Sequence, residues 1–169
     1  MLTRRQFTIG TVLYLMAGSN GMAIAGGGTM TTDTAAKLEL KKTPQEWRAL
    51  LSPEQYRILR EHGTERAGTS PLDKNYAAGI YECAGCGLAL FASQTKFNSG
   101  TGWPSFYAPL DHAIGSSTDK SFFMTRVEVH CRRCGGHLGH VFEDGPKPTG
   151  LRYCINGVAL KFIPAATQG

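Results

Sequence analysis

The chain has 169 residues, a length that suits one ordinary domain and is too short for two comfortable ones. Hydrophobic residues make up 41% of it and charged residues 18%, which is ordinary for a globular protein. The formal net charge of +5 is mildly basic, and on its own it is too small to indicate a nucleic-acid-binding protein.

The first 25 residues have the pattern of an export signal. Arg4 and Arg5 precede an apolar run that two glycines and an asparagine interrupt, so the run does not supply the roughly 20 apolar residues of a transmembrane helix. Small residues at 23–25 suit cleavage by a signal peptidase. We therefore predict that residues 1–25 are a signal peptide that resembles the twin-arginine type and directs export to the periplasm. An ordinary secretory signal and a membrane anchor are the alternatives.

The next segments divide the remaining chain into a linker and a domain. Residues 26–41 are rich in Gly, Thr and Ala, and they are predicted to be a flexible linker. The folded domain is predicted at 42–164, and residues 165–169 are predicted to be a disordered tail.

Two helix-start motifs open the predicted domain. Thr43 and Ser52 are each followed by Pro and, three residues later, by Glu or Gln. A hydroxyl at the cap, Pro at the first helical position and a side chain that reaches back to the cap are the parts of a capping box. Gly63 is expected to end the second helix. The sequence therefore predicts two short helices at the N-terminal side of the domain.

After these helices the hydrophobic period changes from helical to strand-like. Short apolar or alternating runs are separated by Gly, Pro, Asn and Asp, which favour turns. The bulk of the domain is therefore predicted to be antiparallel β. The runs lie at residues 79–83, 88–91, 121–130, 139–142, 151–156 and 158–163.

Four of the five cysteines form two pairs with metal-ligand spacing. Cys83 and Cys86 lie in "CAGC", Cys131 and Cys134 lie in "CRRC", and glycine follows each pair. Two such turns with four thiolates suit a tetrahedral zinc ion. Residues 87–130 make a longer separation than the about 15–20 residues of a compact zinc ribbon, so we expect one structural zinc that joins two separate hairpins. Disulfides in an oxidising compartment, or a redox dithiol, are the alternatives.

The fifth cysteine, Cys154, has no partner nearby in the sequence. On a strand, residues two apart share a face, so Arg152, Cys154 and Asn156 line one side while the apolar residues between them line the other. A guanidinium beside a thiol favours the thiolate, which is the nucleophilic form. The pattern therefore favours a reactive thiol over a cysteine that only fills the core.

Further polar and aromatic candidates lie upstream of this strand. His137 and His140 flank Gly139, and both can reach one pocket only if the chain bends or bulges there. Taken singly, each histidine is more typical of a structural residue or a metal ligand. Trp103 lies in a loop constrained by Gly and Pro, where a pocket wall and a core aromatic are both open interpretations.

Long stretches of the chain resemble the methionine sulfoxide reductase B family. The resemblance is carried by "SGTGWPSF", by "RRCGGHLGHVFEDGPKPTGLRYCINGVALKF" and by the two CxxC pairs, and it covers residues 42–164. It implies a mainly β fold of two antiparallel sheets in a zinc-stapled, tent-like or barrel-like domain. It also implies a peptide-methionine (R)-S-oxide reductase that repairs oxidised methionine in proteins or peptides during oxidative stress.

The resemblance also implies roles for single residues. Cys154 would be the catalytic cysteine and Trp103 the aromatic wall that holds the substrate methyl group. The polar side of the pocket and the residues that flank the nucleophile would be His137, His140, Arg152 and Asn156. Sulfoxide chemistry agrees, since a thiolate can attack the sulfur while an imidazolium protonates the oxygen. Methionine then leaves, and Cys154 remains as a sulfenic acid.

One position departs from the family pattern and bears on recycling. Thr101 stands where many members have a second redox cysteine in "SGCGWPSF". With four cysteines assigned to zinc, an outside thiol would have to reduce the Cys154 sulfenic acid directly. We therefore expect a thioredoxin-like or other thiol reductant as partner. We also expect a monomer, no nucleic-acid partner and no stable membrane association after signal removal.

Two other classes of function are the alternatives. A zinc-stapled binding module for protein or RNA would need clustered basic residues with aromatic residues between them, and only "CRRC" offers such a cluster. A thiol-disulfide oxidoreductase would need a CxxC pair in a thioredoxin-like βαβ context, whereas these pairs lie between strand-like runs.

Overall fold

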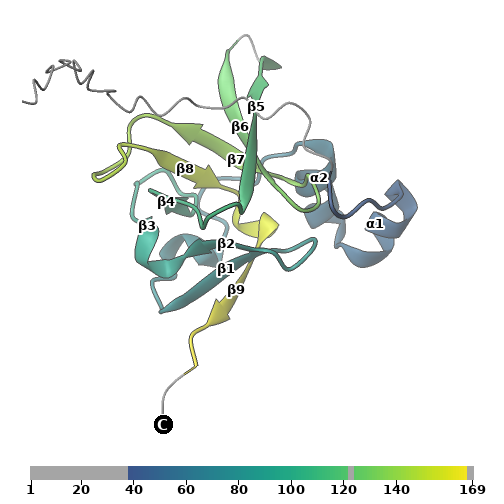
Figure 1. Ribbon diagram of the computed structural model, residues 1–169, viewed down its shortest axis with the longest axis horizontal. Helices are drawn as coiled ribbons and strands as arrows, with labels where there is room; N and C mark the ends of the chain where they lie inside the picture. Colours follow the sequence, from purple (N-terminus) through teal and green to yellow (C-terminus); the bar gives the residue numbers. More distant parts are fainter. Residues whose placement is uncertain (1–37, 122–123, 167–169) are drawn as a thin grey trace, which may run out of the picture. The chain divides into compact units, whose positions relative to one another are not determined.

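The computed structural model describes residues 38–121 and 124–166, drawn as coloured ribbon in Figure 1. The predicted signal at 1–25, most of the predicted linker and the last three residues of the predicted tail lie outside the described residues. Within the described part, no helix is both long and apolar enough to cross a membrane.

Two short helices open the described domain, as predicted. Helix α1 spans Pro44–Leu50 and helix α2 spans Pro53–Glu61, and both start with a complete capping box. In α1, the Thr43 backbone N–H donates to Oε2 of Glu46 at 2.7 Å, and the Glu46 N–H donates back to Oγ1 of Thr43 at 3.3 Å. Ser52 starts α2 in the same way. Each box satisfies backbone donors that a helix start would otherwise leave unpaired.

Helix α2 ends one residue earlier than the glycine suggested. His62 adopts the left-handed conformation at the C-cap, with φ of 53°, in place of Gly63. Gly63 is still constrained by close packing, because a Cβ there would lie 2.9 Å from the carbonyl oxygen of Arg57. The consequence is that an imidazole, rather than a bare glycine, sits at the end of α2.

The strands form two antiparallel sheets, which confirms the mainly β prediction (Figure 1). The three-stranded sheet has the order β2-β1-β9, and the six-stranded sheet has the order β3-β4-β8-β7-β6-β5. The strands span Gly79–Cys83 (β1), Ala89–Ala92 (β2), Lys96–Phe97 (β3), Ser105–Phe106 (β4), Ile114–Asp119 (β5), Arg126–Cys131 (β6), His137–Phe142 (β7), Arg152–Ile155 (β8) and Leu160–Pro164 (β9). In the described residues, short 3₁₀ helices span Pro71–Lys74 (η1) before β1, Ser93–Thr95 (η2) between β2 and β3, and Gly157–Ala159 (η4) between β8 and β9.

Several strands differ from the sequence prediction. The run predicted over 121–130 is a strand at Arg126–Cys131, the run predicted over 139–142 begins at His137, and β3, β4 and β5 were not predicted. Strand β5, "IGSSTD", is half-buried or exposed along its length, so it has no apolar face to give a period of two. It forms because its backbone pairs with β6, from Ile114 opposite Cys131 to Asp119 opposite Arg126.

Aromatic side chains link the two sheets in the core. Phe106 of β4 stacks on Phe91 of β2 with ring centroids 4.4 Å apart, and Tyr81 of β1 meets Phe106 edge-on at 5.0 Å. All three are fully buried. Helix α2 packs on β7 and η4 through Ile58 and Leu59, so the helices cover one part of the larger sheet. This packing fixes where β8 and β7, which carry Cys154 and the two predicted histidines, lie relative to the smaller sheet.

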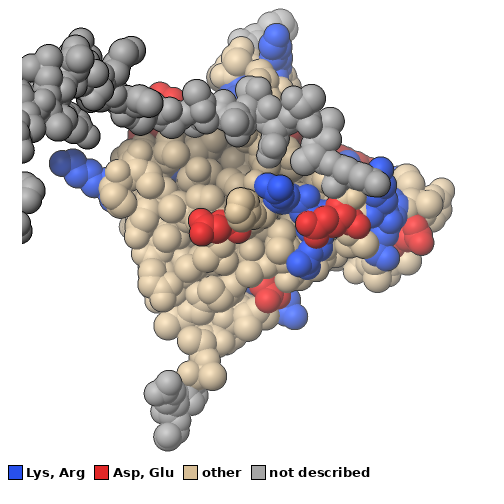
Figure 2. All heavy atoms as spheres, in the orientation of Figure 1, with Lys and Arg blue, Asp and Glu red and all other residues tan. Residues whose placement is uncertain are grey.

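Charged side chains of both signs intermix on the face of the molecule shown in Figure 2, most densely over the helices. Arg48 and Glu61, for example, approach to 3.9 Å between α1 and α2, and both are more than half exposed. Exposed pairs of this kind contribute little to stability.

Candidate active site and metal centre

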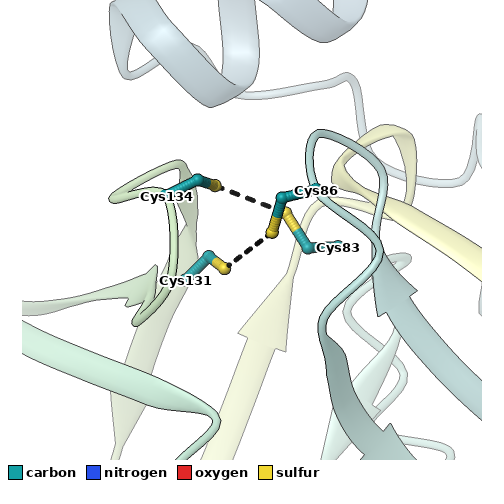
Figure 3. A group of neighbouring side chains, drawn as sticks. All are labelled: Cys83, Cys86, Cys131 and Cys134. Atoms are coloured by element: carbon teal, nitrogen blue, oxygen red, sulfur yellow. Dashed lines mark hydrogen bonds between the residues drawn. The ribbon is translucent and has the colours of Figure 1, made fainter. Parts of the chain in front are cut away.

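The four paired cysteines converge on one point between the two sheets (Figure 3). Cys83 ends β1 of the smaller sheet and Cys131 ends β6 of the larger one. The Sγ atoms of Cys83 and Cys134 lie 3.8 Å apart, and those of Cys86 and Cys131 lie 3.5 Å apart. A disulfide would need about 2.05 Å, and all five cysteines are free. The four sulfurs therefore form a thiol cluster that could hold a metal ion, instead of two disulfides.

Local turns aim these sulfurs at one another. Gly87 and Gly135 have φ of 69° and 67°, and each closes its turn with a 2.8 Å backbone hydrogen bond to the carbonyl of the first cysteine of its pair. Hydrogen bonds from the neighbouring sulfurs, Cys131 first and Cys83 next, hold the pKa of Cys134 well below its usual range. A thiolate held among three other sulfurs is the donor that a soft or borderline cation prefers.

Cys154 lies apart from this cluster, at the centre of β8. It pairs with Ser105 of β4 on one side and with His140 of β7 on the other. Its side chain is half-buried and borders a cavity of about 210 Å³. The other residues that line this cavity are Thr64, Trp103, Arg126, Gly139, His140, Phe142 and Asn156. One thiol is therefore presented to a small, mostly apolar pocket with a few polar groups, the form expected of a small-molecule or side-chain site.

Burial and charge act on the Cys154 thiol in opposite directions. Burial raises its pKa, while a hydrogen bond from Thr101 and the positive charge of Arg152 lower it, and burial outweighs both. Oγ1 of Thr101 lies 4.0 Å from Sγ. Arg152 is held in place by two 2.8 Å hydrogen bonds to the carboxylate of Asp144 and by the ring of Phe142, 4.4 Å from its guanidinium carbon. The guanidinium therefore favours the thiolate, as the sequence suggested, although the net pKa shift is upward.

A bulge in β7 brings the two predicted histidines together. Val129 of β6 pairs with Gly139 and the adjacent His130 pairs with His137, so β7 has one residue more than β6 in this interval. The extra residue places His137 and His140 on the same side, with ring centroids 5.5 Å apart and nearly edge-on. Gly139 is required here because a Cβ would lie 2.0 Å from the carbonyl oxygen of Cys154.

Each histidine is paired with a carboxylate from another strand of the larger sheet. Nδ1 of His137 is 2.7 Å from Oε1 of Glu128 on β6, and Nε2 of His140 is 2.8 Å from Oδ2 of Asp119 on β5. Burial alone would raise the pKa of Glu128, but hydrogen bonds from His137 and Ser117 bring it to about 2. Burial lowers the pKa of His140, and the Asp119 hydrogen bond only partly opposes this. Both carboxylates therefore stay ionised and fix the orientation of the rings.

The two histidines share one cavity, and only His140 also lines the cavity around Cys154. His140 lines the cavity around Cys154 and is directly opposite that cysteine across the β7–β8 ladder. His137 is buried and lines a neighbouring cavity of about 440 Å³, together with Asp119 and Glu128. His140 is therefore the histidine that is positioned for direct contact with a molecule bound at Cys154.

Comparison with known proteins identifies the family of this chain. The SelR domain model matches residues 51–164. The chain belongs to the methionine sulfoxide reductase B family. It is 57% identical over 125 residues to the "Peptide methionine sulfoxide reductase MsrB" of Leptospira interrogans, which covers 73% of this chain and 95% of that protein. The protein of the same name from Thiobacillus denitrificans is 60% identical over 124 residues, covering 73% and 94%. The "Peptide methionine sulfoxide reductase B3, chloroplastic" of Oryza sativa is 54% identical over 129 residues, covering 75% of this chain and 56% of the rice protein. This membership makes the chain an oxidoreductase, as its motifs predicted.

In this member of the methionine sulfoxide reductase B family, Trp103 and Asn156 also line the cavity around Cys154. Trp103 borders the cavity, and its Nε1–H donates to the carbonyl of Glu65 at 3.2 Å. Asn156 follows Cys154 by two residues and is buried, and its Nδ2 donates to the carbonyl of Leu138 at 3.0 Å. The fold therefore brings Cys154, Trp103, His140 and Asn156 to one cavity, with Arg152 adjacent to the thiol.

Reasoning from sequence missed the buried acid that connects these parts. The backbone N–H of Glu65 donates to Oδ1 of Asn156 at 2.9 Å, and its carbonyl accepts from Trp103. Its carboxylate accepts from the N–H groups of Gly157 at 2.5 Å and Val158 at 3.0 Å. Nothing in "HGTER" distinguishes this acid from a surface one, because its partners are 38 to 93 residues away.

Asp119 and Glu128 were missed for the same reason. The alternation in "RVEVH" offered a weak signal for Glu128, because an acid opposite His140 in an antiparallel pair faces the same side. That pairing could be recognised only after the register of β6 against β7 was known.

Proposed function

We propose that this protein reduces methionine-R-sulfoxide, in proteins or peptides, to methionine with Cys154 as the nucleophile. One observation carries the proposal: the single cysteine outside the four-sulfur cluster borders a cavity that also presents Trp103 and His140. Family membership supports methionine sulfoxide as the substrate class, since the relatives are called peptide methionine sulfoxide reductases. The R preference and the use of a sulfenic acid are the finer parts of the proposal.

The first chemical step joins a thiolate to an electrophilic sulfur. The Cys154 thiolate attacks the sulfoxide sulfur while an acid protonates the sulfoxide oxygen. Oxygen is then transferred to Cys154, which becomes a sulfenic acid, and the substrate sulfur leaves as the thioether of methionine. Two electrons pass from the cysteine sulfur to the methionine sulfur, so no external electron donor is needed in this step.

His140 is the proton donor in this proposal. It lies opposite Cys154 in the β7–β8 ladder and lines the same cavity, whereas His137 lines only the neighbouring cavity, which His140 also borders. Asp119 accepts a hydrogen bond from Nε2 and thereby fixes which ring nitrogen faces the pocket. His137 supports the ring of His140 edge-on at 5.5 Å.

Stereochemistry would follow from the opposite characters of the two pocket walls. The ring of Trp103 offers an apolar surface to the methyl group, and His140 and Asn156 offer polar atoms to the oxygen. Only one sulfoxide epimer can present its methyl group to the first wall, its oxygen to the second and its sulfur to Cys154.

Regeneration requires a thiol from outside the chain in this proposal. Thr101, not a cysteine, is the residue beside Cys154. Two donor thiols would reduce the sulfenic acid, giving the Cys154 thiol, water and the donor disulfide. We propose a thioredoxin-like or other dithiol donor, and a monomeric enzyme.

The metal and the location complete the proposal. Zinc is the ion proposed for Cys83, Cys86, Cys131 and Cys134, because Zn–S bonds of about 2.3 Å in a tetrahedron place sulfurs about 3.8 Å apart. The observed distances of 3.8 and 3.5 Å fit this spacing. The ion would have a structural role, tying β1 to β6. Residues 1–25 are proposed to be a twin-arginine-like signal that places the enzyme in the periplasm.

The decisive experiment is turnover of a racemic methionine sulfoxide peptide, followed by chiral separation of the remaining substrate. Only the R epimer should disappear, and Cys154→Ser should abolish turnover while it leaves fold and metal content unchanged. Equal consumption of both epimers, consumption of S alone, or full activity in Cys154→Ser would overturn the proposal.

A further inference from the structure

A second group of metal-ligand side chains lies next to the proposed active site. His62 caps α2, Glu128 lies on β6 and His137 lies on β7, so three separate elements contribute. Nδ1 of His62 and Nδ1 of His137 approach the same oxygen of Glu128, Oε1, at 2.9 and 2.7 Å. The three potential ligand atoms all lie within 4.8 Å of one another.

The backbone conformation of His62 directs its ring toward the other two residues. The position after a helix in the left-handed conformation is usually occupied by Gly or Asn. Here it is occupied by a histidine with φ of 53°, whose ring lies 5.2 Å from the ring of His137. The left-handed cap thus turns an imidazole back toward the buried Glu128–His137 pair.

The exposed fraction of the three side chains decreases from the solvent toward the core. The side chain of His62 is 66% exposed, that of Glu128 12% and that of His137 3%. The three residues border the cavity of about 440 Å³, which has room for an ion and for water beside it. An ion can therefore reach the buried donors from the His62 side, and water can complete its coordination.

We propose that His62, Glu128 and His137 form a second, exchangeable site for a divalent transition-metal ion, separate from the four-cysteine centre. Two imidazoles and one carboxylate are the ligand set of zinc sites that keep an open position for water. Bond lengths of about 2.0–2.2 Å would require ligand atoms about 3.4 Å apart, so the 2.9 Å contact of His62 must open by roughly 0.5 Å and the 2.7 Å contact of His137 by roughly 0.7 Å. The exposed side chain of His62 is free to make the first of these movements, and the second requires a small shift of His137 relative to Glu128.

Occupancy of this site should slow the reductase. The ion would take over Nδ1 of His137 and Oε1 of Glu128, which now bond to each other. The small opening of that contact would move His137 against His140, whose ring it supports at 5.5 Å. This inhibition rests on the proposed function, whereas the binding itself does not.

Binding is tested on the full chain with the cysteine centre filled by zinc, in a Cys154→Ser background that removes the free thiol. Cobalt(II) is titrated and followed by its visible absorption, together with the zinc content of the protein. One cobalt ion should bind without thiolate-to-cobalt charge transfer and without release of zinc. His62→Asn, which keeps a residue that tolerates the left-handed cap, should weaken this binding by at least about tenfold. Glu128→Gln should weaken it as well.

The matched control is His112→Asn, because His112 is also exposed and also has a left-handed backbone, with φ of 55°, but lies outside the cluster. It should bind cobalt like the parent protein. Absence of a further ion in the parent, or undiminished binding in His62→Asn, would overturn the proposed site.

Activity is then compared in chains that retain Cys154, each normalised to its own rate without added metal. Added zinc should inhibit the parent and His112→Asn, and His62→Asn should need at least about tenfold more zinc for the same inhibition. Equal inhibition of His62→Asn would overturn the link between site and activity. An inactive parent without added metal would instead contradict the proposed reductase function and leave the cobalt result standing.

Discussion

Replacement of Glu65 by alanine should destabilise the domain strongly, although this residue belongs neither to the four-cysteine cluster nor to the cavity lining around Cys154. The carboxylate accepts hydrogen bonds from the backbone N–H groups of Gly157 and Val158, at 2.5 and 3.0 Å, in an environment where Glu65 is only 2% exposed. Alanine removes both acceptors and leaves a cavity beside η4.

The size of the effect follows from these two donors. Each buried N–H left without a partner costs about 1–3 kcal/mol. Burial raises the pKa of Glu65 against the effect of the two backbone hydrogen bonds, so loss of the buried charge offsets part of this cost. We expect Glu65→Ala to lower the free energy of unfolding by about 2–4 kcal/mol. Glu65→Gln, which keeps the shape and one acceptor, should lower it by roughly half as much.

Urea unfolding measures the change in free energy directly, and thermal unfolding gives a second measurement. The thermal midpoint should fall by about 6–20 °C for Glu65→Ala, at roughly 3–5 °C per kcal/mol in a domain of this size. Glu143→Ala is the control, because Glu143 is exposed just after β7 and should change stability by less than about 0.5 kcal/mol. The reasoning is wrong if Glu65→Ala unfolds within the range of that control, or if the alanine and glutamine variants are equally stable.

Three other predictions concern the cysteines. Cys83→Ser should lower the melting temperature and metal content together, because metal binding contributes to folding free energy, and normal melting by calorimetry would contradict a structural metal. Arg152→Met should raise the pKa of Cys154, because the guanidinium charge now lowers it, so the pH profile of iodoacetamide alkylation should move to higher pH and the rate at pH 7 should fall. An unshifted profile would show that Arg152 does not act on the thiol. Without reductant, the parent should form one methionine per chain, with Cys154 trapped as a sulfenic acid. Thr101→Cys should instead yield an internal disulfide on mass spectrometry, because the Thr101 oxygen is already 4.0 Å from the Cys154 sulfur. A disulfide between Cys154 and Cys83 in the parent would refute this cycle.

Local signals accounted for much of the fold. The capping boxes at Thr43 and Ser52 depend on residues three apart, and both formed as predicted. The CxxC pairs similarly predicted local turns, and the apolar alternation around Cys154 predicted a strand. Strand β5 carried no such signal, because it is fixed by backbone pairing with β6 and not by a buried face.

The parts that sequence could not provide are contacts between distant segments. Glu65 meets Asn156 across 91 positions, and Asp119 meets His140 across 21. An acid that orients a histidine looks like any surface acid until the strand order is known. The bulge that brings His137 beside His140 was anticipated only as a condition, because glycine permits such a bulge without requiring it.

The last strand of the chain has a consequence for biosynthesis. Strand β9 pairs with β1 from Gly79 opposite Pro164 to Cys83 opposite Leu160, so the smaller sheet joins the beginning of the domain to its end. Until residues 160–164 have left the ribosome, β1 has β2 on one side and an open edge on the other. Native closure of the smaller sheet must therefore wait until β9 has left the ribosome. A nascent chain stalled before Leu160 would present that open edge to other chains, and would be a substrate for chaperones and proteases.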